Sequence, residues 1–345
     1  MPSSSRFFLP LLLAGPGCTE PAPDVELHQL AFCPEFGCST NGPEVKLMTI
    51  ADLSEDRNQY NSAGFRVVGM SKAGDDYTVA VFGDRLYGLD DMGNVGLFPH
   101  QLDDAVIHLE HRTEGPFELH LLEVHYQLTF WVGQLDNIYT YKLGWTDPVT
   151  PHPEPVCPQF QHGDEWGPPG AEAIFFQGDL YDDVTKEVTA IGADAVGSWF
   201  NVACAGSATA KMHATRHTTA GSDQEHQSTR DRRQAMLKMY TADYCGTGKA
   251  FTKLGEPLDW ENIGGWKTLG DDPPEDEAVW DQTGAKCLDT PRMGETAREA
   301  ADWKQAIDAE CERFGRVLPS CAELKRFPEE WQEYGYVRTA NPSWE

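Results

Sequence analysis

Nine cysteines constrain this 345-residue chain more than any other feature of its sequence. One of them, Cys18, follows an apolar segment near the amino terminus and is considered below as a site of lipid attachment. The other eight are Cys33, Cys38, Cys157, Cys204, Cys245, Cys287, Cys311 and Cys321. An even number is typical of chains that fold in an oxidising compartment, where cysteines pair as disulfides. The sequence therefore predicts a disulfide-stapled protein outside the cytoplasm.

The pairing of these cysteines is left open by the sequence, because eight cysteines allow more than a hundred connectivities. Short spacing favours two local bridges, Cys33 with Cys38 and Cys311 with Cys321. The cysteines that remain for long-range bridges are Cys157, Cys204, Cys245 and Cys287.

The amino terminus indicates export. Arg6 precedes an apolar run over 7–14, which has the length of the apolar part of a signal peptide. A membrane-spanning helix needs about 20 residues, so this run is too short to span. The following Gly15-Pro16-Gly17-Cys18 resembles a lipoprotein cleavage box, in which Cys18 receives the lipid. Cleavage near Ala14 without lipid, giving a secreted protein, is the alternative.

The balance of charge argues against nucleic acid as a partner. The chain has 55 acidic and 27 basic residues, a net charge of −28. Such a field repels nucleic-acid phosphates and anionic lipid headgroups. We therefore expect no nucleic-acid partner, and contact with a membrane only through the lipid on Cys18.

The first half of the chain has the pattern of β-strands. Candidate strands rich in β-branched and aromatic residues cover 64–69, 77–82, 105–109, 117–132 and 137–143, and another covers 199–204. In the longest one the alternation of apolar and polar residues breaks at Leu121 and Leu122, where a β-bulge would restore it. The fold class predicted is mainly β, sandwich- or barrel-like, with a few helices in the C-terminal half.

A proline-rich passage over 147–170 suggests a division of the chain, since proline donates no hydrogen bond to a strand ladder. We expect this passage to be a linker or loop between two β units. The predicted organisation is a signal peptide over 1–17, a tether over 18–30, an N-terminal β unit over 31–146, the linker, a C-terminal β unit with helices over 171–325, and a tail over 326–345.

Two segments have helical patterns. The first, 225–240, is expected to place Arg230, Arg232 and Arg233 on its solvated side and to be capped by Gly246. The second covers 295–314 and is followed by Gly315.

The first helix leads into Ala242-Asp243-Tyr244-Cys245-Gly246. Together with Cys33-Pro34-x-x-Gly37-Cys38, Cys204-Ala205-Gly206, and Glu277-Ala278-Val279-Trp280, this motif resembles the ADYC domain. Proteins with this domain are secreted or lipid-anchored bacterial proteins found mainly in myxobacteria. The resemblance covers most of residues 30–325 and implies an address outside the cytoplasm, but no particular reaction or ligand.

The motif residues have structural interpretations that outweigh catalytic ones. Cys245 would be a nucleophile only with a histidine close by, and an oxidising compartment favours a disulfide instead. Asp243 is expected to accept hydrogen bonds in a cap or turn. Tyr244 is expected to lie in the core with its hydroxyl hydrogen-bonded to a backbone group. We therefore assign no catalytic residue.

No metal or cofactor is expected either. His213 and His217 have the spacing of two ligands on a helix, but their context is typical of a strand or loop. The acidic cluster at Asp179, Asp182 and Asp183 and the one over 271–277 lack the alternating pattern of a calcium loop.

Two functional hypotheses remain. The preferred one is a non-enzymatic lipoprotein of the cell envelope, at the outer membrane or cell surface, which binds an unidentified protein or glycan ligand or has a structural role. The alternative is a secreted hydrolase whose carboxylates are assembled by the fold. In that case two carboxylates about 5 to 10 Å apart should lie in a cleft beside aromatic residues such as Trp145 or Trp166.

Overall fold

The structure of the protein is a computed structural model. It describes residues 42–128, 137–157, 161–162, 165–166, 172–189, 198–219, 229–252, 258–265, 276–294, 296–324 and 328–340. Within these ranges the protein is mainly β, as the sequence predicts, and its α-helices lie in the second half of the chain. Cys18, Cys33 and Cys38 lie outside the described residues, as do the expected signal peptide and tether.

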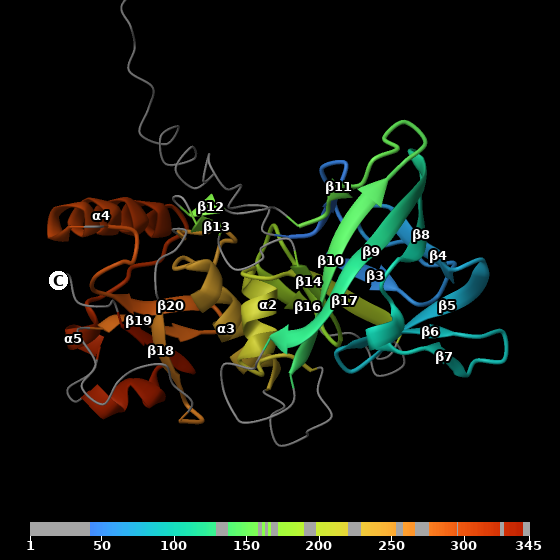
Figure 1. Cartoon of the computed structure of the whole chain (residues 1–345). Coiled ribbons are helices and arrows are strands. Elements are labelled where there is room, and N and C mark those ends of the chain that lie inside the picture. Colours follow the sequence, from blue (N-terminus) through green and yellow to red (C-terminus); the bar gives the residue numbers. More distant parts are fainter. Residues whose placement is uncertain are drawn as a thin grey trace, which may run out of the picture.

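The largest element is an eleven-stranded antiparallel sheet. Its strands, in spatial order, are β3 (Asp52–Ser54), β17 (Trp199–Cys204), β14 (Glu172–Gln177), β10 (Ile138–Thr146), β9 (Gly115–Leu128), β8 (Ala105–His111), β4 (Phe65–Lys72), β5 (Asp75–Phe82), β6 (Arg85–Leu89) and β7 (Val95–Leu97), with β11 (Glu154–Pro155) paired to β10. Figure 1 shows that this sheet is strongly curved and forms one side of the molecule. The predicted strands are confirmed.

The curvature brings distant strands together without closing a barrel. The side chain of Glu55, just after β3, accepts a hydrogen bond from the backbone N–H of Val81 on β5 at 2.7 Å. The backbone N–H of Gln177 on β14 donates to the carbonyl of Gly83 at 2.8 Å. Strand twist coils a wide sheet, so that strands near its two ends approach each other. Here isolated hydrogen bonds join them, and no continuous ladder of backbone hydrogen bonds forms between these described strands.

The concave face of this sheet encloses an aromatic and aliphatic core. Phe65 and Phe117 meet edge-on at 5.6 Å between ring centroids, and Tyr141 meets Phe175 at 5.0 Å. All four side chains are at most 2% exposed. Full burial of a large apolar side chain contributes about 1.5–3 kcal/mol, so this cluster is a main source of stability.

The predicted bulge in the long strand is confirmed. On β10, Lys142 lies opposite Glu123 of β9, but the next residue, Leu143, lies opposite Leu121. Leu122 is therefore skipped in the pairing, and its side chain is 39% exposed. The extra residue returns the apolar positions of β9 to the core side.

The sheet continues across the expected linker. Strands β14 and β17 follow the proline-rich passage in the sequence, yet they pair with β10 and with β3 on either side of them. The passage is thus an excursion that returns to the same sheet, and the predicted boundary over 147–170 does not separate two sheets. The disulfide between Cys157 and Cys204 ties this excursion to β17.

A second, four-stranded sheet lies on the other side of the molecule (Figure 1). Its order is β18 (Asp259–Asn262), β21 (Val337–Ala340), β19 (Asp276–Asp281) and β20 (Gly284–Leu288). Strand β21 belongs to the segment expected to be a tail, and it pairs on both edges. Four residues are too few to give a periodic signal, which explains the error.

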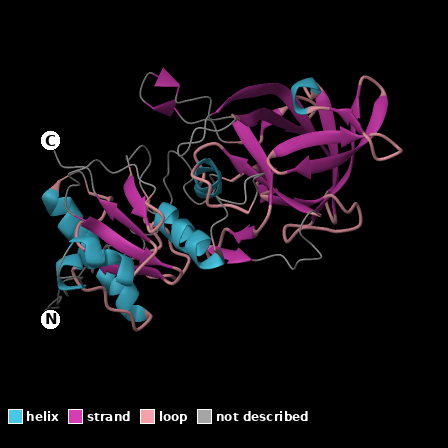
Figure 2. Cartoon of the chain, turned by 90° about the horizontal axis from the view of Figure 1, so that it is seen from below, coloured by secondary structure: helices cyan, strands magenta, loops and turns pink. Residues whose placement is uncertain are grey.

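The helices complete the fold, and Figure 2 shows the longer ones gathered on one side, whereas one short helical turn lies on the curved sheet. The α-helices are α2 (Ala208–Ala214), α3 (Arg230–Thr241), α4 (Ala297–Arg313) and α5 (Cys321–Leu324), and short 3₁₀ segments cover Pro99–Gln101 and Pro328–Glu333. Two-stranded pairs are formed by β1 (Glu44–Val45) with β2 (Met48–Thr49), β12 (Gln161–His162) with β13 (Glu165–Trp166), and β15 (Leu180–Asp182) with β16 (Glu187–Thr189). None of the described helices is long and apolar enough to cross a membrane.

The second predicted helix is confirmed as α4, but two expectations about the first were wrong. Ala242, not Gly246, is the left-handed C-cap of α3, with φ of 49°. Arg233 is buried and its Nε lies 2.5 Å from the Oδ2 atom of Asp179. The partner carboxylate comes from a distant turn, so the local sequence could not reveal this burial.

Three disulfides join described cysteines: Cys157–Cys204, Cys245–Cys311 and Cys287–Cys321. The predicted local bridge between Cys311 and Cys321 is therefore wrong. Helix α4 carries Cys311 back to the end of α3, while Cys321 begins α5 against β20. All three bridges thus link separate elements and close loops of 34 to 66 residues.

Glu55→Gln tests the contact that joins the ends of the curved sheet. Burial raises the pKa of Glu55 to about 7, although the bond from Val81 opposes this. An unfolded glutamate titrates near pH 4.3, so unfolding at intermediate pH releases a proton and stability falls as pH rises towards 7. Glutamine keeps the acceptor oxygen, so we expect the variant to lose less unfolding free energy between pH 5 and 8, measured by urea denaturation.

Glu114→Gln serves as the control. This exposed carboxylate pairs with Lys46, which lowers its pKa, so its charge does not change over that interval. Equal losses of stability in Glu55→Gln and the wild type would contradict the buried position of Glu55.

Candidate functional site

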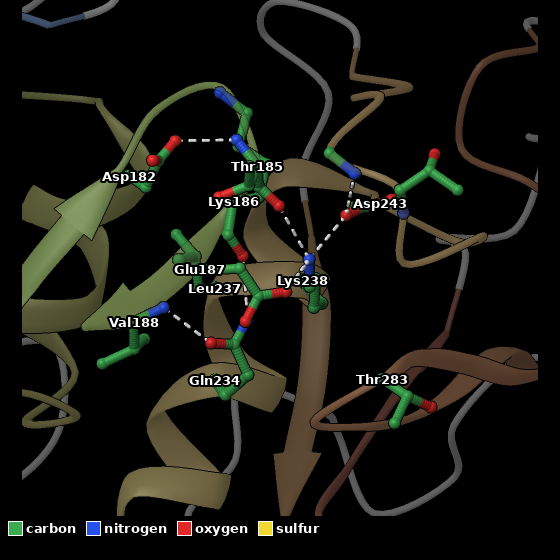
Figure 3. Close-up of polar contacts among 12 residues, drawn as sticks. Asp182, Thr185, Lys186, Glu187, Val188, Gln234, Leu237, Lys238, Asp243 and Thr283 are labelled. Atoms are coloured by element: carbon green, nitrogen blue, oxygen red, sulfur yellow. Dashed lines mark hydrogen bonds and ion pairs between the residues drawn. The ribbon is translucent and has the colours of Figure 1, made fainter. Parts of the chain in front are cut away.

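The end of α3 is built around a buried lysine. Lys238 and Asp243 are both fully buried, and the Nζ atom of Lys238 lies 2.9 Å from the Oδ2 atom of Asp243. The same ammonium lies 3.0 Å from the Oε1 atom of Glu187 and donates to the carbonyl of Thr185 at 3.0 Å. Figure 3 shows these contacts converging on the lysine from the β15–β16 hairpin and from the turn after α3.

Asp243 also organises the turn that follows the helix. Its two carboxylate oxygens accept hydrogen bonds from the backbone N–H groups of Thr247, at 2.9 Å, and Gly248, at 2.8 Å. An ionised carboxylate is a strong hydrogen-bond acceptor. The Asp243 carboxylate can therefore pair with Lys238 and close the turn at the same time. The expectation that Asp243 is a turn acceptor is confirmed.

Tyr244 connects the motif to the four-stranded sheet. Its hydroxyl donates to Glu277, which lies on β19 and is fully buried. Glu277 receives two hydrogen bonds of 2.8 Å from the guanidinium of Arg292, which also donates to the carbonyl of Met239 in α3 at 3.1 Å. The Tyr244 ring packs against Trp280 with centroids 5.0 Å apart. The predicted core position of Tyr244 is confirmed, but its hydroxyl is bonded to a side chain and not to the expected backbone group.

The charge states in this cluster follow from the contacts. Burial alone would raise the pKa of Glu277, but the charge and hydrogen bonds of Arg292 outweigh it and hold this pKa below its usual value. Burial and the neighbouring Glu277 charge raise the pKa of Tyr244 well above its usual value. The phenol therefore stays protonated and acts as a donor. We call Lys238, Asp243, Tyr244, Glu277 and Arg292 the α3 junction.

The last two motif residues make the junction covalent and compact. Cys245 forms its disulfide with Cys311 of α4. Gly246 has φ of 70°, and a Cβ atom there would lie 1.9 Å from the carbonyl oxygen of Thr283. Only glycine fits such a close approach of two backbones. Cys245 is thus bonded to another cysteine, and the side chains of Asp243 and Tyr244 are engaged in contacts within the protein.

The histidines expected to be a weak metal pair point to different partners. His213 lies at the end of α2, which corrects the expectation of a strand or loop there. Its Nδ1 atom lies 2.9 Å from the hydroxyl of Thr218, and its Nε2 atom lies 3.3 Å from Asp84. His217 lies beyond the helix and accepts from the amide of Asn262 at 2.9 Å. The two rings do not share a ligand position.

The Asp84–His213–Thr218 arrangement has the order of groups found in a nucleophilic site. Thr218 is 3% exposed and His213 is 1% exposed, and Phe176 stacks on the His213 ring at 4.7 Å. A substrate has no access to a hydroxyl packed this way. These residues instead tie the β5–β6 turn to α2.

Acidic residues do not form a metal centre in the described part of the chain, where no group of three or more candidate ligands is found. Asp182 accepts from the backbone of Val184 and Thr185 and so closes the β15–β16 turn. Most of the 271–277 cluster lies outside the described residues. Trp145 is partly buried against Phe117, and the side chain of Trp166 lies outside what the structure describes.

One cavity lies next to the junction, among β15, β17, α2 and α3. Its volume is about 90 Å³. The polar residues that line it include Tyr181, Asn201, Ser207, Lys211, Tyr240 and Thr241. No local sequence pattern indicates this site, because the lining residues come from several separate segments of the chain.

The fold and the junction together define a class: a disulfide-stapled, mainly β protein whose polar core is assembled around the end of one helix. The family model of the ADYC domain matches residues 99–294, more than half of the chain. The chain belongs to the ADYC domain family. No curated protein and no solved structure matches it.

Asp243→Asn should destabilise the protein strongly. The substitution leaves the buried ammonium of Lys238 short of one negative partner and places an amide donor among other donors. Breaking a buried ion pair on one side costs about 3–5 kcal/mol. Urea denaturation should show a loss of this size.

Glu187→Gln is the matched control, because it removes the other carboxylate from the same lysine. Its side chain is 45% exposed, so its contribution is screened by water and a loss of at most about 1 kcal/mol is expected. Similar losses in the two variants would contradict the assignment of Asp243 as the principal partner.

Cys245→Ser should lower the unfolding free energy by about 2–5 kcal/mol, the usual cost of removing a native bridge. Cys311 becomes a free thiol, and thiol titration in denaturant should find one thiol more than in the wild type. A wild-type protein in which Cys245 reacts as a free thiol, with an unchanged melting temperature in the variant, would overturn the structural role.

Proposed function

We propose that this ADYC-domain protein is a lipoprotein of the cell envelope with a binding or structural role and no catalytic one. The observation that carries the proposal is the use of the motif: Asp243 holds Lys238, Tyr244 holds Glu277, and Cys245 is bridged to Cys311. Aspartate, tyrosine and cysteine are the residue types in the motif that could take part in a reaction. Each of the three side chains is already bonded to another part of the protein.

The location outside the cytoplasm is supported by the covalent structure. Three long-range disulfides pair six cysteines whose thiols would stay reduced in an ordinary cytoplasm. The short apolar run before Cys18 supports export, and the cleavage box supports a lipid at that residue. We place the anchor at the outer membrane because Thr19, and not an aspartate, follows Cys18.

A binding role agrees with the surface charge. A net charge of −28 keeps the protein soluble at a membrane surface and away from anionic headgroups, so the folded part should extend from its anchor. The cavity beside α3 offers a place for a small ligand.

Cys18→Ala should release the protein from the membrane fraction. Without the cysteine no lipid is attached, and no described helix replaces the anchor. Fractionation and labelling with a fatty-acid analogue measure this directly. Thr19→Ala is the matched control and should stay membrane-bound. An unlipidated wild-type protein whose mature chain begins elsewhere would contradict the anchor and favour plain secretion.

A further inference from the structure

Two donors in the cavity beside α3 have no partner in the described structure. Lys211 lies on α2, and its ammonium makes no ion pair or hydrogen bond there. Tyr181, on β15, is 9% exposed, and its buried hydroxyl has no hydrogen-bond partner. A buried polar atom without a partner is uncommon, because its desolvation costs about 1–3 kcal/mol.

The neighbouring polar groups are already satisfied. The Asn201 amide donates to the carbonyl of Asp179 at 2.9 Å, and the Tyr240 hydroxyl donates to Thr215 at 3.2 Å. Ser207 caps α2 by accepting from the backbone of Ala210 at 3.2 Å. The Lys211 ammonium and the buried Tyr181 hydroxyl are therefore two unused donors, which complement an oxyanion, while Asp183 adds one carboxylate to the same lining.

We propose that this cavity binds the carboxylate group of a small organic acid, with Lys211 as the counter-ion and the Tyr181 hydroxyl as a hydrogen-bond donor. The inference deepens the proposed binding role and rests on it. Burial, together with the charge of Arg292, lowers the pKa of Lys211, and a bound carboxylate would reverse this by stabilising the charged ammonium.

Size and charge select the ligand class. The cavity of about 90 Å³ is smaller than one of about 150 Å³ that holds benzene, so it accommodates only a few non-hydrogen atoms. Exposed Asp183 also lines it, and the whole chain is strongly acidic. A group with a single negative charge is less repelled by this field than phosphate, which favours a monocarboxylate.

Acetate and acetamide provide a matched pair of probes, since they have the same shape and differ in charge. Calorimetric titration of the full-length protein in detergent, at constant ionic strength, should show saturable acetate binding with a dissociation constant in the millimolar range. Acetamide should bind at least tenfold more weakly. Acetate affinity should fall as pH rises and Lys211 loses its proton.

Lys211→Met should weaken acetate binding at least tenfold, and Tyr181→Phe should weaken it several-fold. Lys304→Met is the control, because Lys304 pairs with Asp308 on α4 and does not line the cavity. Should Lys211→Met fail to fold, Tyr181→Phe and the acetamide comparison still decide the question.

Equal binding of acetate and acetamide, absence of saturation, or unchanged affinity in the variants would overturn the proposal. Tighter binding of inorganic phosphate than of acetate would overturn the choice of a carboxylate. Membrane fractionation of Cys18→Ala does not depend on this cavity, so a failure here is distinguishable from a failure of the lipid anchor.

Discussion

The structure depends on the solvation of one buried charge. Lys238 has no exposed surface, so the protein must supply every partner that water would have supplied. Two of these partners, Glu187 and Thr185, belong to the β15–β16 hairpin, and the third, Asp243, belongs to the turn after α3. A single ammonium thereby fixes the helix end to a hairpin and positions the next motif residues. Tyr244 reaches the four-stranded sheet only because this turn is held.

Local patterns were sufficient to predict most strands and the helix α4. Strand β9 was recognised from its alternation, and the same alternation located the bulge at Leu122. These features depend on neighbours in the sequence and on one buried face. The turn role of Asp243 and the core position of Tyr244 were also predictable, because aspartate is favoured in caps and turns and tyrosine is often buried.

Long-range contacts account for what the sequence could not predict. Short spacing favoured a bridge between Cys311 and Cys321, but the path of α4 brings Cys311 to Cys245 instead. Arg233 was expected in solvent because its ion-pair partner, Asp179, is distant in the sequence. The cavity could not be predicted for the same reason, since Lys211 and Tyr181 come to line one space only in the folded chain.

A polar ligand needs hydrogen-bonding groups that the fold leaves unused. In the α3 junction, hydrogen bonds and ion pairs within the protein already use the side chains of Lys238, Asp243 and Tyr244. The cavity is the opposite case, because the buried hydroxyl of Tyr181 has no hydrogen-bond partner there, at the cost of its desolvation, and the ammonium of Lys211 lines the same space. The motif residues thus hold separate elements of the fold together, and a ligand for the binding role that we propose is to be sought among residues outside the motif.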